Sequence, residues 1–396
     1  MNILCICYAI DRRIEPQLPG ISVAGNKMQI NLLRELYSEI GDDLHVISIY
    51  PVAAYPTYKK INIGGFTQAL LSHESVGTLK SVFPYILNLP VVKNICEIFS
   101  TYIVARSLYK KNKIDKIILF NAFPPTAYAA LKLKKRYGCE IICLLADLPV
   151  DDSVKTKGVM KYLRSRFDSY TRMAIRKMDK LIALNKKAVE DFAPGAKYIV
   201  VEGAVNKQDI KDFCYIPPKR KNIVFTGALQ KYNGIVEVVE AMKLLKESDV
   251  VLDIYGKGEF IDYVKEAASK YPNINYCGTL TNEEVMQVQR EAYLLINPRP
   301  TDDYIAQITF PSKMFEYMTS GTPVLATKLN GYTQDFLDNL FIIEENTPQC
   351  IADTIIRVSK LSEDEFKNKA EAAYNMILTT RTWEVQAKRI LEFIKQ

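Results

Sequence analysis

A hydroxyl, a cation and a carboxylate occur within a short stretch of the chain, at Ser312, Lys313 and Glu316. Pro311 followed by Ser is typical of the start of a helix, with Ser as its cap, and at about 100° per residue the three side chains share one arc of that helix. The free N–H groups and the dipole of a helix N-terminus attract anions. Lys313 adds a point charge for phosphate, and Glu316 can accept hydrogen bonds from sugar hydroxyls. The alternative is a surface helix with an ordinary ion pair between Lys313 and Glu316.

A strand, a loop, a helix and a second strand are predicted around these residues. The apolar run at residues 293–296 is expected to be a strand, and a polar loop with Asp302 and Asp303 follows it. Gly321 is expected to end the helix in a left-handed cap, and Pro323 prevents its continuation. Residues 324–327 then form a short buried strand.

The same segment resembles a known family. Residues 310–324, FPSKMFEYMTSGTPV, are similar to the donor-site signature of family-four glycosyltransferases of the GT-B fold. Those proteins often carry two Glu separated by seven residues. Glu316 matches the second, for which the resemblance implies a contact with the nucleotide ribose, whereas Ile308 stands at the first. A polysaccharide-synthesis branch matches more closely, through Asn-Pro-Arg ending at Arg299 and Phe-Pro-Ser-Lys ending at Lys313.

A second part of the resemblance lies at residues 226–234, TGALQKYNG. The family motif here has Gly-Arg-Leu and later Lys-Gly, whose cations bind the donor diphosphate. The glycines match, but Ala228 and Asn233 stand where the family has Arg and Lys. Lys231 or Arg299 is then expected to supply the missing charge.

Two further turns belong to the donor site that the resemblance implies. Gly25 lies in a loop expected to run from residue 11 to residue 26, and the turn at residues 278–280 is expected to hold the nucleobase through backbone groups. The expected donor-binding residues are Gly25, Gly227, Lys231, Asn233, Gly234, Gly278, Thr279, Leu280, Arg299, Thr309, Pro311 and Ser312.

A carboxylate, Asp147, directly follows the strand predicted at residues 140–146. Side chains at the C-terminal ends of parallel strands point into the ligand crevice of an open α/β sheet. Family-four enzymes carry a His or an Asp here, so the resemblance implies that Asp147 lies near the acceptor hydroxyl and acts with Lys313 and Glu316 in catalysis. The alternative is that Asp147 caps its own turn.

Alternating strands and helices predict two α/β domains. Residues 52–78 are expected to be irregular, and residues 80–111 are expected to be helical. The predicted fold is GT-B, with two Rossmann-like doubly wound domains facing each other across a cleft. The expected boundaries are an acceptor-binding domain at 1–205, a nucleotide-sugar-binding domain at 206–380 and a C-terminal helix at 381–396 that returns to the first domain.

The composition excludes several classes of protein. The chain of 396 residues is long enough for two cores, and 48% apolar with 24% charged residues is typical of a globular protein. Its eight Cys residues show no Cys-x-x-Cys spacing, so buried thiols in a reducing compartment are expected, without a zinc site. No Asp-x-Asp pair is present, so no metal site is predicted. The start of the chain does not resemble a signal peptide, and no apolar run is long enough to span a membrane.

Charge is distributed unevenly along the chain. Residues 1–205 carry 29 Lys and Arg against 18 Asp and Glu, whereas the remainder carries 23 against 27. An anionic partner is therefore expected for the first half, and no motif points to nucleic acid. A helix predicted at residues 155–177 carries a basic stripe that suits an anionic membrane surface, although a solvated helix face is an equal alternative. The stripe consists of Lys157, Lys161, Arg164, Arg172 and Arg176.

The predicted function is sugar transfer from a nucleotide-diphosphate sugar to an acceptor hydroxyl, without a further cofactor. The resemblance implies a hexosyltransferase that retains the anomeric configuration, needs no metal and acts in capsule or lipopolysaccharide synthesis on a lipid-linked or glycan acceptor. The expected location is the inner face of the plasma membrane, as a peripheral protein. A GT-B epimerase or phosphorylase and a non-catalytic sugar-nucleotide-binding protein are the alternatives.

Overall fold

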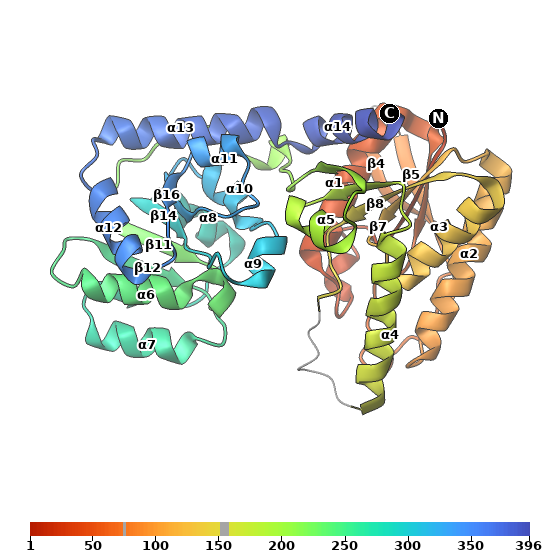
Figure 1. Ribbon diagram of the computed structural model, residues 1–396, viewed down its shortest axis with the longest axis horizontal. Helices are drawn as coiled ribbons and strands as arrows, with labels where there is room; N and C mark the ends of the chain where they lie inside the picture. Colours follow the sequence, from red (N-terminus) through yellow and green to blue (C-terminus); the bar gives the residue numbers. More distant parts are fainter. Residues whose placement is uncertain (74–76, 151–157) are drawn as a thin grey trace. The chain divides into compact units, whose positions relative to one another are not determined.

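The computed structural model describes residues 1–73, 77–150 and 158–396, which form two units (Figure 1). Unit 1 consists of Met1–Glu202 together with Trp383–Gln396, and unit 2 consists of Gly203–Thr382. Helix α14 (Trp383–Lys395) therefore belongs to unit 1, where it packs against α1 (Val23–Ile40).

Unit 1 is built on an eight-stranded sheet with the order β10-β9-β8-β7-β1-β2-β5-β4, parallel except for the antiparallel edge pair β4 and β5. The central strands are continuous apolar runs, because helices on both faces exclude water from them. The strands are β1 (Ile3–Cys7), β2 (Leu44–Ser48), β4 (Phe66–His73), β5 (Gly77–Phe83), β7 (Lys116–Phe120), β8 (Glu140–Leu145), β9 (Lys180–Ala183) and β10 (Lys197–Val200).

Part of this sheet contradicts the prediction for residues 52–111. Residues expected to be irregular or helical instead contain β4, β5 and a separate ribbon of β3 (Asn62–Ile63) and β6 (Ile86–Leu87). Burial alternates along β5, as it does in a strand with one covered face. Pro84 and Pro90 prevent a helix from continuing through this region, so α2 begins only at Val92.

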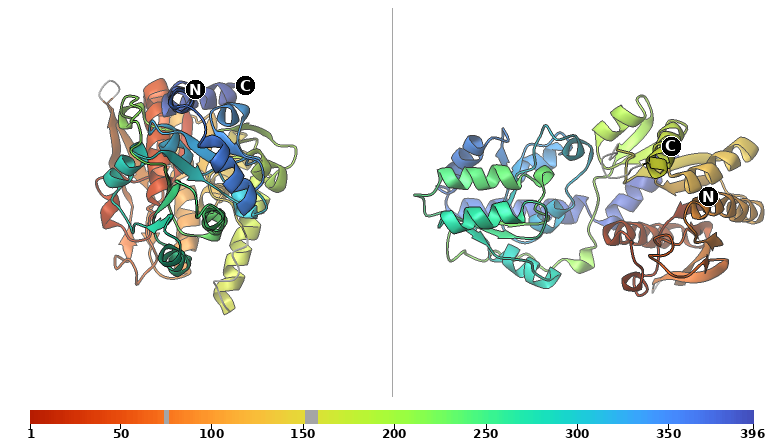
Figure 2. Two further views of the ribbon diagram at one scale, coloured as in Figure 1. Left: turned by 90° about the vertical axis from the view of Figure 1, so that its left-hand side faces the viewer. Right: turned by 90° about the horizontal axis from the view of Figure 1, so that it is seen from below.

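The helices of unit 1 flank the sheet. Helix α2 packs on α3, and α3 packs on α4. The N-terminal part of α4 extends away from the rest of unit 1, and its described side chains are exposed up to Arg166 (Figures 1 and 2). Besides α1 and α14, the helices are α2 (Val92–Asn112), α3 (Pro124–Tyr137), α4 (Gly158–Ile175) and α5 (Lys186–Phe192).

Unit 2 contains a parallel six-stranded sheet with the order β13-β12-β11-β14-β15-β16. Its strands are β11 (Asn222–Thr226), β12 (Val251–Tyr255), β13 (Ile274–Tyr276), β14 (Leu294–Asn297), β15 (Val324–Thr327) and β16 (Phe341–Ile343). Its helices are α6 (Ile235–Leu244), α7 (Ile261–Lys270), α8 (Asn282–Arg290), α9 (Tyr304–Ile308), α10 (Lys313–Met318), α11 (Gln334–Asp338), α12 (Pro348–Val358) and α13 (Glu363–Thr380).

The strand orders confirm the predicted pair of Rossmann-like doubly wound domains. Counted within unit 2, the order is 3-2-1-4-5-6, the order of a dinucleotide-binding fold. The chain reverses its direction of winding between β11 and β14, and between β1 and β7 in unit 1. Ligands of such sheets bind beyond the C-terminal strand ends at this switch point, which directs attention to the loops after these strands.

Candidate functional site

Three glycine turns and Arg299 lie at the C-terminal strand ends of unit 2. Gly227 follows β11 and donates its N–H to the carbonyl of Tyr255 at 2.9 Å. Gly256 follows β12 and donates to the carbonyl of Gly278, after β13, at 2.8 Å. Arg299 follows β14, the neighbour of β11 in the sheet. The structure thus brings residues that were predicted from separate motifs to one edge of the sheet.

Close backbone approach requires glycine at two positions, 234 and 256. A Cβ on Gly234, whose φ is +75°, would lie 1.7 Å from the carbonyl oxygen of Pro298. A Cβ on Gly256, whose φ is +148°, would lie 1.7 Å from the carbonyl oxygen of Gly227. Only glycine permits both the backbone conformation and the contact, so the loops after β11, β12 and β14 pack directly on one another.

Lys313 reaches the end of β11. Its Nζ lies 3.2 Å from Oγ1 of Thr226, and a Cβ on Gly227 would lie 3.3 Å from its Cε. Burial lowers the pKa of Lys313, and the nearby Glu316 raises it. Within the part of the chain that the structure describes, Lys313 forms no salt bridge, so its charge is not neutralised by a close carboxylate.

Arg299 is a buried cation with neutral partners. Only 9% of the residue is exposed. Its guanidinium is 3.4 Å from Oδ1 of Asn233, 3.3 Å from Oγ1 of Thr309 and 5.8 Å from the centre of the Tyr232 ring. Burial lowers the pKa of Arg299, and among the described residues no carboxylate comes within salt-bridge distance of it. A buried charge without an opposite charge is costly, so Arg299 and Lys313 together favour an anionic ligand at this edge.

Thr226 and Tyr317 hold this arrangement, and the sequence did not single them out. The Thr226 N–H donates to the Tyr317 hydroxyl at 3.0 Å, which in turn lies 3.2 Å from the Thr226 carbonyl. Gln289 donates to the Thr226 hydroxyl at 3.1 Å. These buried bonds fix α10 against the end of β11. The sequence signal that could have identified Thr226 is a hydroxyl residue at the end of a predicted strand, directly before Gly227.

The start of α10 differs from the prediction. Ser312 has helical backbone angles, φ −53° and ψ −25°, and its hydroxyl makes no capping bond, because a cap residue needs an extended backbone. The helix has six residues, fewer than expected. Its dipole is correspondingly short, so the positive charge at this site comes chiefly from the side chains of Lys313 and Arg299.

The other predicted donor residues of unit 2 line the same edge with different exposure. Glu316, Lys231, Ser312 and Thr279 are exposed, Leu280 is half-buried, and Pro311 is buried. Gly278 has φ +82° and open space where a Cβ would lie. Asn233 donates its amide to the Ala228 carbonyl at 2.9 Å and so braces the loop after β11.

The loop predicted around Asp302 and Asp303 contains the short helix α9. Asp303 caps it by accepting a hydrogen bond from the Ala306 N–H at 2.9 Å. Ile308, at the position where the family often carries its first Glu, is 2% exposed and packs inside unit 2. Because Asp303 caps a helical turn, residues 304–308 form α9 where a loop was expected.

Asp147 lies at the C-terminal edge of the unit 1 sheet, next to Asn121, which the sequence reasoning missed. Asn121 follows β7 with φ +61° and donates Nδ2 to Oδ2 of Asp147 at 3.1 Å. Its Oδ1 accepts the N–H groups of Ala146 and Asp147, both at 2.9 Å. Removal of water by the surrounding protein raises the pKa of Asp147, and the bond from Asn121 lowers it. The Asn121 side chain braces this turn, and the surrounding protein covers the Asp147 carboxylate only in part.

Gly25 does not lie in a loop. Helix α1 begins at Val23, four residues earlier than predicted, because Ser22 caps it with its side chain. The Gly25 N–H donates to Oγ of Ser22 at 3.1 Å. Its amide therefore serves the helix cap.

The basic stripe of α4 divides into two parts. Lys157 lies outside the described residues, whereas Lys161 and Arg164 are exposed. Arg172 donates to the Pro149 carbonyl at 2.5 Å, and Arg176 donates to the Phe192 carbonyl at 3.3 Å. The C-terminal part of the stripe thus also stabilises unit 1. None of the described helices is long and apolar enough to cross a bilayer.

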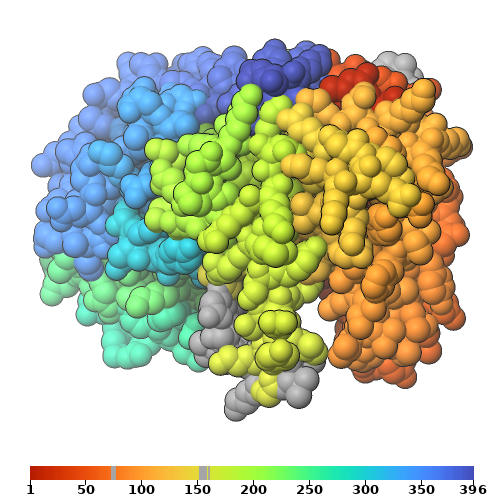
Figure 3. Space-filling view, turned by 45° about the vertical axis from the view of Figure 1, so that its right-hand side comes forward, coloured from red at the N-terminus to blue at the C-terminus, as the bar shows by residue number. Residues whose placement is uncertain are grey.

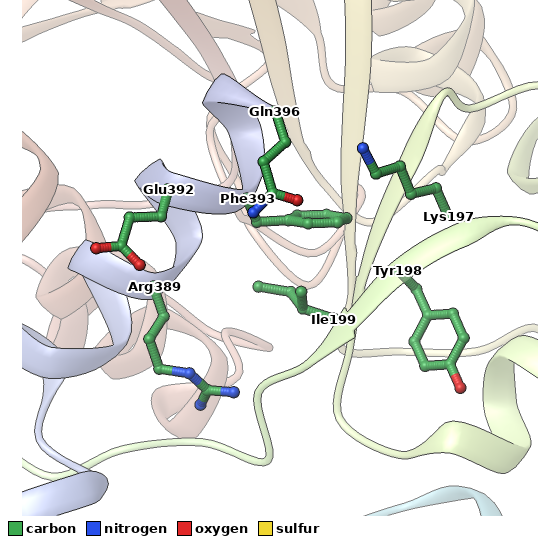
Figure 4. A pocket seen from close by; sticks show the side chains of 7 residues that line it. All are labelled: Lys197, Tyr198, Ile199, Arg389, Glu392, Phe393 and Gln396. Carbon is green, nitrogen blue, oxygen red and sulfur yellow. The ribbon is translucent and has the colours of Figure 1, made fainter.

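A cavity of about 290 Å³ lies between β10 and α14 in unit 1 (Figure 4). Its lining includes Lys197, Arg389, Glu392 and Phe393, and the Phe393 ring lies among the other side chains. None of the predicted site residues lines it, so the candidate site remains the edge described above.

Comparison with known proteins supports this assignment. Residues 220–360, which contain Gly227, Arg299 and Lys313, match the family model described as "Glycosyl transferases group 1". No curated protein sequence matches the chain. The prediction of a glycosyltransferase is confirmed at the level of this class.

Solved structures resemble the whole chain. A sucrose-phosphate synthase from Thermosynechococcus elongatus has a TM-score of 0.66 at 12% identity, covering 100% of this chain and 99% of that one. A glycosyltransferase from Rickettsia africae has a TM-score of 0.65 at 15% identity, with 100% and 98% covered. Anabaena HepE in complex with UDP has a TM-score of 0.63 at 13% identity, with both chains fully covered. These similarities confirm the GT-B fold.

Proposed function

We propose that this protein transfers a sugar from a nucleotide-diphosphate sugar to an acceptor hydroxyl. The observation that carries the proposal is a pair of cations, the buried Arg299 and the half-buried Lys313, which lie at the switch point of a Rossmann-like sheet and, among the described residues, have no carboxylate within salt-bridge distance. A diphosphate supplies the missing negative charge. Anabaena HepE, whose fold is similar, was solved with UDP and with UDP and glucose.

The donor would be held by groups from several loops. Lys313 and Arg299 would bind the diphosphate, Lys231 would add an exposed charge, and Glu316 would accept hydrogen bonds from the ribose. The turn at residues 278–280, which follows β13, would contact the base. As the sugar–phosphate bond breaks, negative charge accumulates on the leaving diphosphate, and fixed cations stabilise that charge. We therefore propose that the reaction needs neither a metal nor a further cofactor.

The acceptor would bind at unit 1. Asp147 is an exposed carboxylate at the C-terminal edge of that sheet, and Asn121 orients it. We assign Asp147 to the acceptor hydroxyl, and by resemblance to family-four enzymes we propose retention of the anomeric configuration. The Phe-Pro-Ser-Lys motif ending at Lys313 supports a role in capsule or lipopolysaccharide synthesis on a lipid-linked or glycan acceptor, at the inner face of the plasma membrane.

The test is turnover of nucleotide sugars. The protein is incubated with a panel of UDP-, GDP-, ADP- and dTDP-sugars with EDTA present, and released nucleoside diphosphate is measured. Slow hydrolysis of one donor is expected, because such enzymes transfer to water when no acceptor is present. Binding of a nucleotide sugar without any hydrolysis or transfer would favour a non-catalytic sugar-nucleotide-binding protein. That alternative is suggested by Ala228 and the buried Ile308, which stand where family-four enzymes have an Arg and a Glu.

A further inference from the structure

Helix α2 of unit 1 has polar residues on its buried side and large apolar residues on its exposed side. Glu97 is 6% exposed, and Thr101 and Ala105 are fully buried. The apolar side chains on the opposite face recur every three or four residues, and we call them the α2 stripe. They are Val92 (41% exposed), Ile95 (53%), Phe99 (53%) and Ile103 (66%). An amphipathic helix of a globular protein normally buries such a stripe.

Specific contacts hold α2 in this orientation. Nζ of Lys93 lies 3.6 Å from Oε1 of Glu97 and also donates to the Val52 carbonyl. On the neighbouring side, the Phe99 ring packs edge-on against Tyr128 of α3, with 5.9 Å between ring centres. Rotating α2 to cover its apolar residues would break the bond from Lys93 to the Val52 carbonyl and the ring contact between Phe99 and Tyr128, and it would expose Glu97, so the exposed stripe is a stable feature of the fold.

The helices beside the α2 stripe are strongly basic. Together α2, α3 and α4 carry twelve Lys and Arg but only two acidic residues. One of the two, Glu97, is buried, and the other, Asp168, lies 3.9 Å from Arg164. The three helices pack in sequence as one layer, whose surface Figure 3 shows in part, with α4 extending beside α3. A layer of helices with this charge favours an anionic surface.

We propose that the α2–α3–α4 layer binds an anionic lipid bilayer, with the α2 stripe inserted among the lipids. Apolar insertion and attraction between basic residues and anionic headgroups act together in peripheral membrane helices. A second copy of the chain fits less well, because two basic layers would repel each other.

The location of α2 connects this surface with the acceptor. Lys93 contacts Val52, just beyond the C-terminal end of β2, so α2 begins at the same edge of the sheet that carries Asp147. An embedded stripe would therefore place the bilayer beside the proposed acceptor edge. In this respect the inference deepens the proposed function and rests on it, whereas membrane binding itself can be tested independently.

The first test is flotation with vesicles of phosphatidylglycerol and phosphatidylcholine, compared with phosphatidylcholine alone, at low and high salt. The variant combines Ile95→Ser, Phe99→Ser and Ile103→Ser. The control combines Leu244→Ser and Met286→Ser, which change apolar residues of unit 2 that are 55% and 40% exposed. The wild type and the control should bind anionic vesicles, and the triple variant should bind at least about tenfold more weakly. Equal binding of all three proteins would overturn the proposal.

A fluorescence experiment locates the inserted face. Trp383 is the chain's single tryptophan and is 4% exposed, so Phe99→Trp adds a reporter on an almost silent background. Anionic vesicles should shift its emission to shorter wavelength, and lipids brominated on their acyl chains should quench it. A water-exposed spectrum on bound vesicles would contradict insertion.

Two further measurements distinguish the bilayer from a second copy of the chain, and the α2 stripe from the donor site. If sedimentation equilibrium shows a dimer that the triple variant abolishes, and no vesicle binding is found, the partner of the α2 stripe is a second copy of the chain and the bilayer proposal is wrong. Nucleoside diphosphate binding should be unchanged in the triple variant, because the stripe lies in unit 1. If the triple variant loses vesicle binding but still binds nucleotide, the α2 stripe acts in membrane binding and not in the donor site. If the wild type does not bind any nucleotide, the proposed function is contradicted, whatever the result with vesicles.

Discussion

Nζ of Lys313 lies 3.2 Å from the hydroxyl of Thr226, so a cation from α10 lies at the end of β11, and no carboxylate of the described residues forms a salt bridge with it. Thr226 is itself fixed by Tyr317 and Gln289. The Lys313 ammonium is thus held rigidly without a salt bridge among the described residues. Such an arrangement suits the binding of an anionic ligand.

Removing this charge should stabilise the ligand-free protein. Lys313→Met keeps much of the apolar stem and removes a half-buried cation without a close carboxylate among the described residues, so we expect a free energy of unfolding about 1 kcal/mol higher. The matched control is Lys231→Met, which changes an exposed cation of the same site and should have little effect. Urea denaturation without nucleotide measures both. A clear loss of stability in Lys313→Met would show that the cation serves the fold.

Glu316 should recognise the ribose, and the diphosphate should not depend on it. Glu316→Ala is expected to weaken binding of a nucleoside diphosphate roughly tenfold, by the loss of hydrogen bonds to a charged group. Affinity for inorganic pyrophosphate should stay the same, since it has no ribose. Competition between pyrophosphate and a labelled nucleotide measures both affinities, and parallel losses would argue against a specific ribose contact.

Asp147 should act on turnover more than on donor binding. Asp147→Asn keeps the size of the side chain and removes its charge, so we expect kcat to fall at least about tenfold with a small change in donor affinity. Steady-state kinetics with a fixed acceptor, combined with donor titration, separates the two quantities. Wild-type kcat in this variant would leave Asp147 as a structural residue of its turn.

Gly234 and Gly138 provide a matched pair for the packing of the donor loops. Both have positive φ, +75° and +78°, but a Cβ on Gly234 would collide with the Pro298 carbonyl, whereas a Cβ on Gly138 meets nothing within 4 Å. Gly138→Ala should cost about 1 kcal/mol from backbone strain alone. Gly234→Ala should cost several times more and abolish nucleotide binding. Thermal unfolding compares them, and similar losses would contradict the close approach.

The buried pair of Lys93 and Glu97 should make the stability of unit 1 depend on pH. Burial raises the pKa of Glu97 to about 7, and Lys93 lowers it. A folded-state pKa above the unfolded value favours folding at low pH, and this contribution is lost as pH rises toward 7. It corresponds to at most about 3 kcal/mol. Urea unfolding from pH 5 to pH 8 should show the loss in the wild type and a flatter profile in Glu97→Gln. Identical profiles would exclude Glu97 as the source.

The second half of the chain was largely predictable because its signals are local. Apolar runs of strand length, each followed by Gly, Pro or a polar turn, identify β11 and β14 and therefore the loops at Gly227 and Arg299. In a parallel sheet covered on both faces, such runs have few alternatives. The resemblance of residues 310–324 to a donor motif identified Lys313 directly, and the structure adds its contact with Thr226.

The first half was less predictable because long-range pairing decides its structure. The strand β5 joins β2, which precedes it by about thirty residues, and no local pattern distinguished it from the start of a helix. The sequence also does not show that the apolar face of α2 is exposed, because periodicity alone assigns its Val, Ile and Phe side chains to a core. The burial of Glu97, Thr101 and Ala105 shows which face is inside.

Titration calorimetry with nucleoside diphosphates tests the central claim most directly. Wild-type protein is titrated with UDP, GDP, ADP and dTDP, and then Lys313→Gln and Arg299→Gln are titrated with the diphosphate that binds most tightly. We expect one diphosphate to bind and each variant to lose roughly 10- to 100-fold in affinity, the effect of about 1.5–3 kcal/mol per lost charged hydrogen bond. Circular dichroism confirms that both variants are folded. Absence of binding to every diphosphate, or unchanged affinity in both variants, would contradict a diphosphate site at Lys313 and Arg299.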